Sequence, residues 1–166
     1  METNLKNLPE SNLSIHLSYP LIEDNDDITF TTENGTVYSV YFTDGSGYLP
    51  EAPFSSLLLM FGFERKHRVR NPAGSDPRIL STIIYALHLA FQREANLIIL
   101  YVCSQANDLQ KKRSLLFEEV YQQFKAGYTK VDYSEGDSFF CSAIFRDDNP
   151  YSQDIKESIK KFIQDK

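Results

Sequence analysis

The stretch "LLLMFGFERKHRVRNPAGSDPRILSTIIYALHLAFQREANLIILYVC", residues 57–103, decides the fold of this 166-residue chain. Two apolar segments, 57–63 and 97–103, lie on either side of a segment with helical periodicity. Residues 97–103 are apolar at every position, which is typical of a strand buried on both faces of a sheet. A strand, a helix and a strand in succession usually form a parallel, right-handed pair, so we predict such a pair here.

The segment between the two strands carries a clear helix start. Asp76 can cap the free backbone N–H groups, and Pro77 at the first helical position loses no hydrogen bond. An apolar stripe at helical spacing then continues to a helix end near Glu94. The stripe consists of Ile79, Leu80, Ile83, Leu87, Ala90 and Phe91.

Upstream, residues 28–42 have the pattern of a β-hairpin. Asn34-Gly35 lies between two segments rich in strand-forming residues, and both residues tolerate the positive φ of a two-residue type I′ turn. The register that follows pairs Thr32 with Val37, Phe30 with Ser39, and Ile28 with Tyr41. Residues 13–21 are a possible edge strand that Pro20 would end.

Downstream, the pattern predicts a helix, a hairpin and a last helix. The helix begins at Asn107 or Asp108 and ends at Ala126, before Gly127 as its C-terminal cap. The hairpin comprises 128–133 and 138–145, and the last helix follows Asn149-Pro150. We therefore expect a single α/β domain over residues 1–166 with a mixed (α+β) sheet and a frayed end at 1–12. Its order is N-terminal antiparallel strands, a parallel β-α-β crossover, a second helix, a C-terminal β-hairpin and a C-terminal helix.

Composition favours a soluble globular protein, with 42% hydrophobic and 24% charged residues. No apolar run approaches the roughly 20 residues of a membrane span. The N-terminal residues lack the basic and apolar regions of a secretory signal, so we expect a cytoplasmic protein without membrane attachment. Cys103 and Cys141 fit buried reduced thiols, and a disulfide between neighbouring strands is the alternative.

The charge is unevenly distributed along the chain. The net charge of −6 argues against general nucleic-acid binding. Residues 1–56 hold nine acids and one lysine, whereas residues 57–126 hold ten bases and six acids, a local charge of +4. The middle third is therefore the part that would attract an anionic ligand.

Basic residues follow both strands of the predicted parallel pair. The loops that leave two parallel strands emerge at the same end of a sheet, and open α/β sheets bind ligands at this edge. An anion between the two basic groups would also offset the unfavourable position of cations near a helix N-terminus. The candidate ligand-binding residues are Arg65, Arg68, Arg70, Lys111, Lys112 and Arg113. The alternative is that these long side chains simply extend into water.

The order of elements over residues 28–145 resembles the core of the GCN5-related N-acetyltransferase fold. That resemblance implies acetyl-CoA as cofactor, with its pyrophosphate on an Arg/Gln-x-x-Gly-x-Gly/Ala turn at a helix N-terminus. Here the corresponding turn, Arg70 to Asp76, is one residue longer before Gly74 and ends in a carboxylate, which favours a capped helix start. The family's Asn-x-x-Ala-x-x-x-Tyr pattern is also absent, because counting from Asn107 gives Gln110 and Ser114.

A second resemblance is to a small bacterial family of unknown function. The stretches that carry it are "TTENGTVYSVYFTDGSGY", "MFGF" and "DPRILSTII". It implies no chemistry.

No catalytic or metal site is expected, because His16, His67 and His88 fall on separate elements. The preferred interpretation is a binding or interaction module without a cofactor, whose partner is a protein or a small anionic ligand. The first alternative is an atypical acyl-CoA-dependent N-acyltransferase that uses acetyl-CoA. A weaker one is contact with RNA or DNA through the basic edge.

Overall fold

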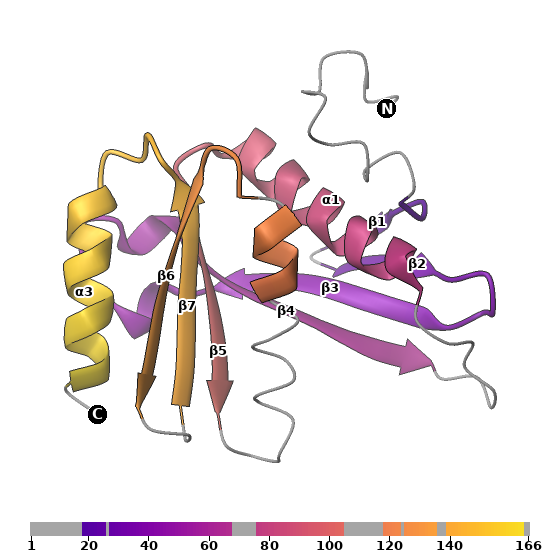
Figure 1. The fold of residues 1–166 in the computed structure, drawn as a ribbon, viewed down its shortest axis with the longest axis horizontal. Helices are drawn as coiled ribbons and strands as arrows, with labels where there is room; N and C mark the ends of the chain where they lie inside the picture. The colour runs from indigo at the N-terminus through magenta and orange to yellow at the C-terminus, as the bar shows by residue number, and fades with distance from the viewer. Residues whose placement is uncertain are drawn as a thin grey trace.

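A computed structural model describes residues 18–25, 27–67, 76–104, 118–123, 125–135 and 139–164. Its strands form one seven-stranded sheet in the order β1-β2-β3-β4-β5-β7-β6 (Figure 1). The strands are β1 (Ile22–Asp24), β2 (Asp27–Thr31), β3 (Val37–Asp44), β4 (Leu58–His67), β5 (Ile98–Ser104), β6 (Tyr128–Glu135) and β7 (Phe139–Arg146). Every neighbouring pair is antiparallel except β4 and β5. The mixed α/β sheet and its parallel pair are therefore confirmed.

The parallel pair is short. Leu58, Leu59 and Met60 of β4 pair with 98–100 of β5, and the ladder between the two strands ends there. Beyond this point β4 pairs with β3 and β5 pairs with β7, and Figure 1 shows β4 and β5 pointing away from each other. The sheet thus consists of two halves that share only three residue pairs.

Two long helices cover opposite faces of the sheet. α1 (Pro77–Arg93) packs on one face with β2–β5, and α3 (Ser152–Gln164) packs on the other face over β5, β7 and β6 (Figure 1). The short 3-10 helices η3 (Ser46–Tyr48) and η4 (Ser55–Leu57) precede β4. Residues 118–123 are helical, and Val120 packs into the α1 face. No described helix is long and apolar enough to cross a membrane.

The apolar pattern explains this arrangement. In β5, Ile99 and Tyr101 belong to the core under α1, whereas Ile98 and Leu100 belong to the core under α3. A strand buried on both faces was predicted for this segment, and the prediction is confirmed. Burial of each large apolar side chain contributes roughly 1.5–3 kcal/mol relative to exposure.

The predicted register of the β2–β3 hairpin is wrong by one residue. Phe30 pairs with Tyr38 and Ile28 with Val40, not with Ser39 and Tyr41 as expected. Thr32 does not face Val37, which pairs with Thr31; instead the Thr32 N–H donates to the Thr36 carbonyl at 2.9 Å.

The cause of the shift is the length of the turn. The Gly35 N–H donates to the Thr32 carbonyl at 2.9 Å, and Gly35 has φ +86° whereas Asn34 does not have positive φ. This geometry is a three-residue loop with a glycine bulge rather than a type I′ turn. It places the apolar side chains of both strands together on the α1 face.

The other predicted elements are largely confirmed. α1 begins and ends within a residue of the predicted bounds, and Gly127 has φ +87° at the start of the β6–β7 hairpin. Cys141 is a buried thiol that forms no disulfide, so the disulfide alternative is wrong. Of the predicted second helix, residues 118–123, 125 and 126 are described; 118–123 are helical, but 125 and 126 are not, so the predicted end at Ala126 is wrong. Of the possible edge strand only 18–21 are described, and these residues are not in a strand. β1 was not predicted.

Candidate functional site

One of the six candidate anion-binding residues lies within the described residues. Arg65 lies near the end of β4, is exposed, and forms none of the ion pairs found among the described residues. Arg68 and Arg70, and Lys111, Lys112 and Arg113, lie outside the described residues. The convergence of the two basic groups stays a prediction, and the divergence of β4 and β5 means that a ligand would have to span two separating strand ends.

Lys66, the neighbour of Arg65, is not available to such a ligand. Its ammonium group forms an ion pair with the Asp27 carboxylate of β2, which also accepts a hydrogen bond from the buried Ser39 hydroxyl. The β3–β4 register shifts beside Lys66, so that Val37 pairs with His67 and Tyr38 with Arg65. Lys66 therefore links β4 to β2 within the sheet and is not part of the candidate anion site.

The Asp27 contacts make the stability of this part of the sheet depend on pH. The hydrogen bond from Lys66, and then the one from Ser39, hold the pKa of the Asp27 carboxyl below its usual value. A depressed pKa in the folded state adds stability that is present above the unfolded pKa of about 4 and is lost as the pH falls through the folded pKa. Asp27→Asn should therefore lower stability at pH 7, and the difference from the unchanged protein should shrink at pH 3.

Urea denaturation at both pH values measures this difference. Asp24→Asn, on the exposed strand β1, is the matched control and should lack the effect. A stability difference for Asp27→Asn that is the same at pH 7 and pH 3 would contradict the assignment.

The N-terminus of α1 is closed by side chains. The Asp76 carboxylate accepts a hydrogen bond from the Arg78 N–H at 3.0 Å, and its second oxygen accepts one from the Tyr19 hydroxyl. The Tyr19 N–H donates to the Thr82 hydroxyl at 2.9 Å, which holds the incoming chain against the helix. The predicted cap is confirmed, and its carboxylate stands where an incoming anion would need N–H donors.

Tyr19 is fixed on both faces of its ring. The Arg78 guanidinium lies 3.8 Å from the ring centre on one face, and Phe30 stacks at 6.1 Å. Burial, and then the hydrogen bond to Asp76, raise the pKa of the Tyr19 hydroxyl above its usual value, so this hydroxyl stays protonated. Arg78 also pairs with Glu33 at 3.1 Å, so its charge is partly neutralised.

Two aromatic side chains pack against each other at the point where β4 and β5 diverge. Phe61 and Tyr101 each follow the last paired residue of their strand, and their ring centres lie 6.2 Å apart. Both are nearly inaccessible, with exposed fractions of 4% and 7%. A ligand at the strand exits would therefore bind beyond these rings.

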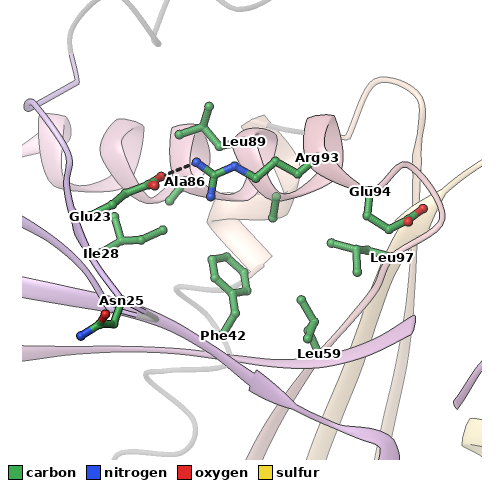
Figure 2. Close-up of a pocket in the computed structure, with 11 residues that line it drawn as sticks. Glu23, Asn25, Ile28, Phe42, Leu59, Ala86, Leu89, Arg93, Glu94 and Leu97 are labelled. Atoms are coloured by element: carbon green, nitrogen blue, oxygen red, sulfur yellow. Dashed lines mark hydrogen bonds and ion pairs between the residues drawn. The ribbon is translucent and has the colours of Figure 1, made fainter. Parts of the chain in front are cut away.

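A cavity that was not predicted lies between the sheet and the C-terminal half of α1. This α1 pocket has a volume of about 360 Å³ and is drawn in Figure 2. It is lined by Glu23, Asn25, Ile28, Phe42, Leu59, Ala86, Leu89, Ala90, Arg93, Glu94 and Leu97. Ala86 and Ala90 line it from the helix, and Phe42 and Leu59 line it from the strands. The small side chains in the sequence "ALHLA" (86–90) are the one signal that could have indicated it.

Comparison with known proteins assigns no family. No protein-family model matches the chain, and no curated protein matches it. A crystal structure of an uncharacterized protein from Bacillus halodurans is similar at 14% identity and a TM-score of 0.42, over 86% of this chain and 68% of that chain. This similarity assigns no activity.

Proposed function

We propose that the protein is a cytoplasmic binding module that accepts a phosphate-bearing anion at the outgoing ends of β4 and β5. The observation that carries this proposal is that these two strands are parallel, so that basic segments far apart in the sequence follow strands that leave the same paired region. The exposed Arg65 at the end of β4 supports it, because its guanidinium can donate bidentate hydrogen bonds to a phosphate.

A second candidate is an acyl-CoA-dependent N-acyltransferase with a GCN5-related fold. The strand order, with one parallel pair that parts after three residue pairs, favours it, because the same order of elements led to that resemblance in the sequence. The closed N-terminus of α1 opposes it, since Asp76 and Tyr19 stand where the pyrophosphate of CoA would need free N–H groups. The binding module is therefore the preferred function.

Calorimetric titration with pyrophosphate, CoA and acetyl-CoA tests both functions. The binding module predicts that pyrophosphate and CoA bind with similar affinity and that added salt weakens both. The triple variant Arg65→Ala/Arg68→Ala/Arg70→Ala should weaken binding by about tenfold, since each lost exposed charge pair contributes about 0.5 kcal/mol and about 1.4 kcal/mol corresponds to tenfold.

The matched control removes three exposed lysines of α3, on the other face of the sheet, as Lys156→Ala/Lys160→Ala/Lys161→Ala. This control should leave the affinity unchanged. Binding of CoA but not pyrophosphate, with acetyl transfer to an amine, would establish the second candidate instead. No binding of any of the three ligands would overturn both.

A further inference from the structure

The floor of the α1 pocket is apolar and comes from three neighbouring strands of the sheet, β2, β3 and β4. Figure 2 shows Phe42 of β3 and Leu59 of β4 beneath the helix, with Ile28 at one end and Leu97 at the other. Ala86 and Ala90 form the helix side and are too small to fill the space opposite Phe42. The volume of about 360 Å³ falls within the range of roughly 300–1,000 Å³ that is common for small-molecule sites.

The rim of the α1 pocket carries all of its charge. Arg93 reaches from the last turn of α1 across the opening and pairs with Glu23 of β1 at 2.6 Å, as the dashed line in Figure 2 shows. Glu94 adds a second carboxylate that forms no ion pair within the described part of the chain, and its side chain accepts a hydrogen bond from the Asn96 N–H. The rim therefore holds two carboxylates and one guanidinium.

The surroundings of the opening strengthen this negative balance. Asp24 adds a further carboxylate on the exposed strand β1, between Glu23 and Asn25, which both line the pocket. Because Glu23 already neutralises Arg93, a ligand carboxylate would have to displace Glu23, whereas an ammonium group would meet the Glu94 carboxylate directly. Charge complementarity thus selects a cation with an apolar body.

We propose that the α1 pocket is a binding site for a small amphipathic amine. The alkyl or aryl body lies between Phe42, Leu59 and the two alanines, and the ammonium group lies beside Glu94, at the end of the opening away from Glu23. This site is separate from the anion site proposed above, because Leu59 and Leu97 line the pocket at the incoming ends of β4 and β5, whereas the anion site is proposed at their outgoing ends. The two proposals can fail independently.

Octylamine, octanol and octanoate test the proposal, because they share one chain length and carry a positive charge, no charge and a negative charge. We expect octylamine to bind more tightly than octanol, and octanol more tightly than octanoate, by calorimetry on the full chain. In ¹H–¹³C methyl spectra, octylamine should shift the methyl signals of Ile28, Leu59 and Leu97. Octanoate binding as tightly as octylamine, or octylamine shifts elsewhere in the protein, would overturn the proposal, and so would no binding at all.

Two variants on α1 test the location of the apolar body. Ala90→Phe fills the space opposite Phe42 and should abolish octylamine binding. Gln92→Phe adds the same side chain at an exposed position of the same helix that does not line the pocket, and it should leave binding unchanged. Circular dichroism checks that both variants fold. Equal loss of binding in the two variants would contradict the assignment.

Two variants at the rim of the pocket test the charge recognition, because they should change the affinity for octylamine in opposite directions. Glu94→Gln should weaken octylamine binding by about two- to fivefold, the usual effect of one exposed charge pair. Arg93→Gln removes a like charge and releases Glu23, so it should strengthen octylamine binding by a similar factor. Glu157→Gln on α3 is the control for a lost surface carboxylate. Weaker octylamine binding in Arg93→Gln would overturn the proposed role of the rim.

Discussion

Phe30→Ala is expected to lower the free energy of unfolding by about 3–5 kcal/mol, the usual effect of removing a fully buried aromatic side chain. Phe30 is completely inaccessible, on strand β2 beneath α1. Its ring stacks on Tyr38 at 5.2 Å and on Tyr19 at 6.1 Å, with interplanar angles of 9° and 11°. The change therefore leaves a cavity and also frees the tyrosine that closes the N-terminus of α1.

Chemical denaturation monitored by circular dichroism measures this loss. Thr31→Ala, at the next and exposed position of β2, is the matched control and should change the free energy of unfolding by less than about 0.5 kcal/mol. Phe30→Leu should recover much of the stability, because it refills most of the volume. A loss below about 1 kcal/mol for Phe30→Ala would mean that the stacked rings of Tyr19, Phe30 and Tyr38 do not hold β2 under α1.

The double variant Glu118→Gln/Asp132→Asn is expected to have the second largest effect, a destabilisation of about 2–3 kcal/mol, because the lysine side chain is buried while both carboxylates are half exposed. Lys130 of β6 has a side chain only 5% exposed, and its ammonium group pairs with Glu118 and, at 2.6 Å, with Asp132. The double change keeps the shape of both partners but leaves the buried ammonium group without a carboxylate.

Lys130→Met separates the contribution of charge from that of packing. It removes the charge of Lys130 and keeps an unbranched apolar side chain at this position. The Glu118 and Asp132 side chains are 42% and 57% exposed, so water can solvate both carboxylates in this variant. Lys130→Met should therefore cost less than the double variant in a urea denaturation series. If Lys130→Met were the more damaging change, the ion pairs themselves would be stabilising the link between residues 118–123 and β6.

The helix starts and the centre of the sheet could be predicted from the sequence because their signals are local. Asp76-Pro77 names a cap and a first helical residue, and the uninterrupted apolar run at 97–103 indicates burial on two faces. The parallel direction of β4 and β5 followed from the helix between them.

The hairpin register could not be predicted in the same way. Asn-Gly favours a two-residue turn, yet the loop is three residues long, because this length places Phe30 opposite Tyr38 and Ile28 opposite Val40 under α1. Here packing across the sheet outweighed the local turn preference. The short strand β1 gave no signal because its three residues are all exposed.

The candidate site was predictable only as a list of charges. The sequence could not indicate that Lys66 is taken by Asp27, because the two residues meet across β2, β3 and β4 through a register shift. It also could not reveal the α1 pocket, which depends on how far Ala86 and Ala90 stand from the sheet.

The three residue pairs that join β4 to β5 also bear on how the chain folds. β1 to β4 form a meander of antiparallel neighbours, and β6 with β7 form a hairpin, so both closures need only moderate sequence separation. The pairings of β4 with β5 and of β5 with β7 close longer loops, and such contacts generally form late. The seam between the two halves is therefore expected to assemble last.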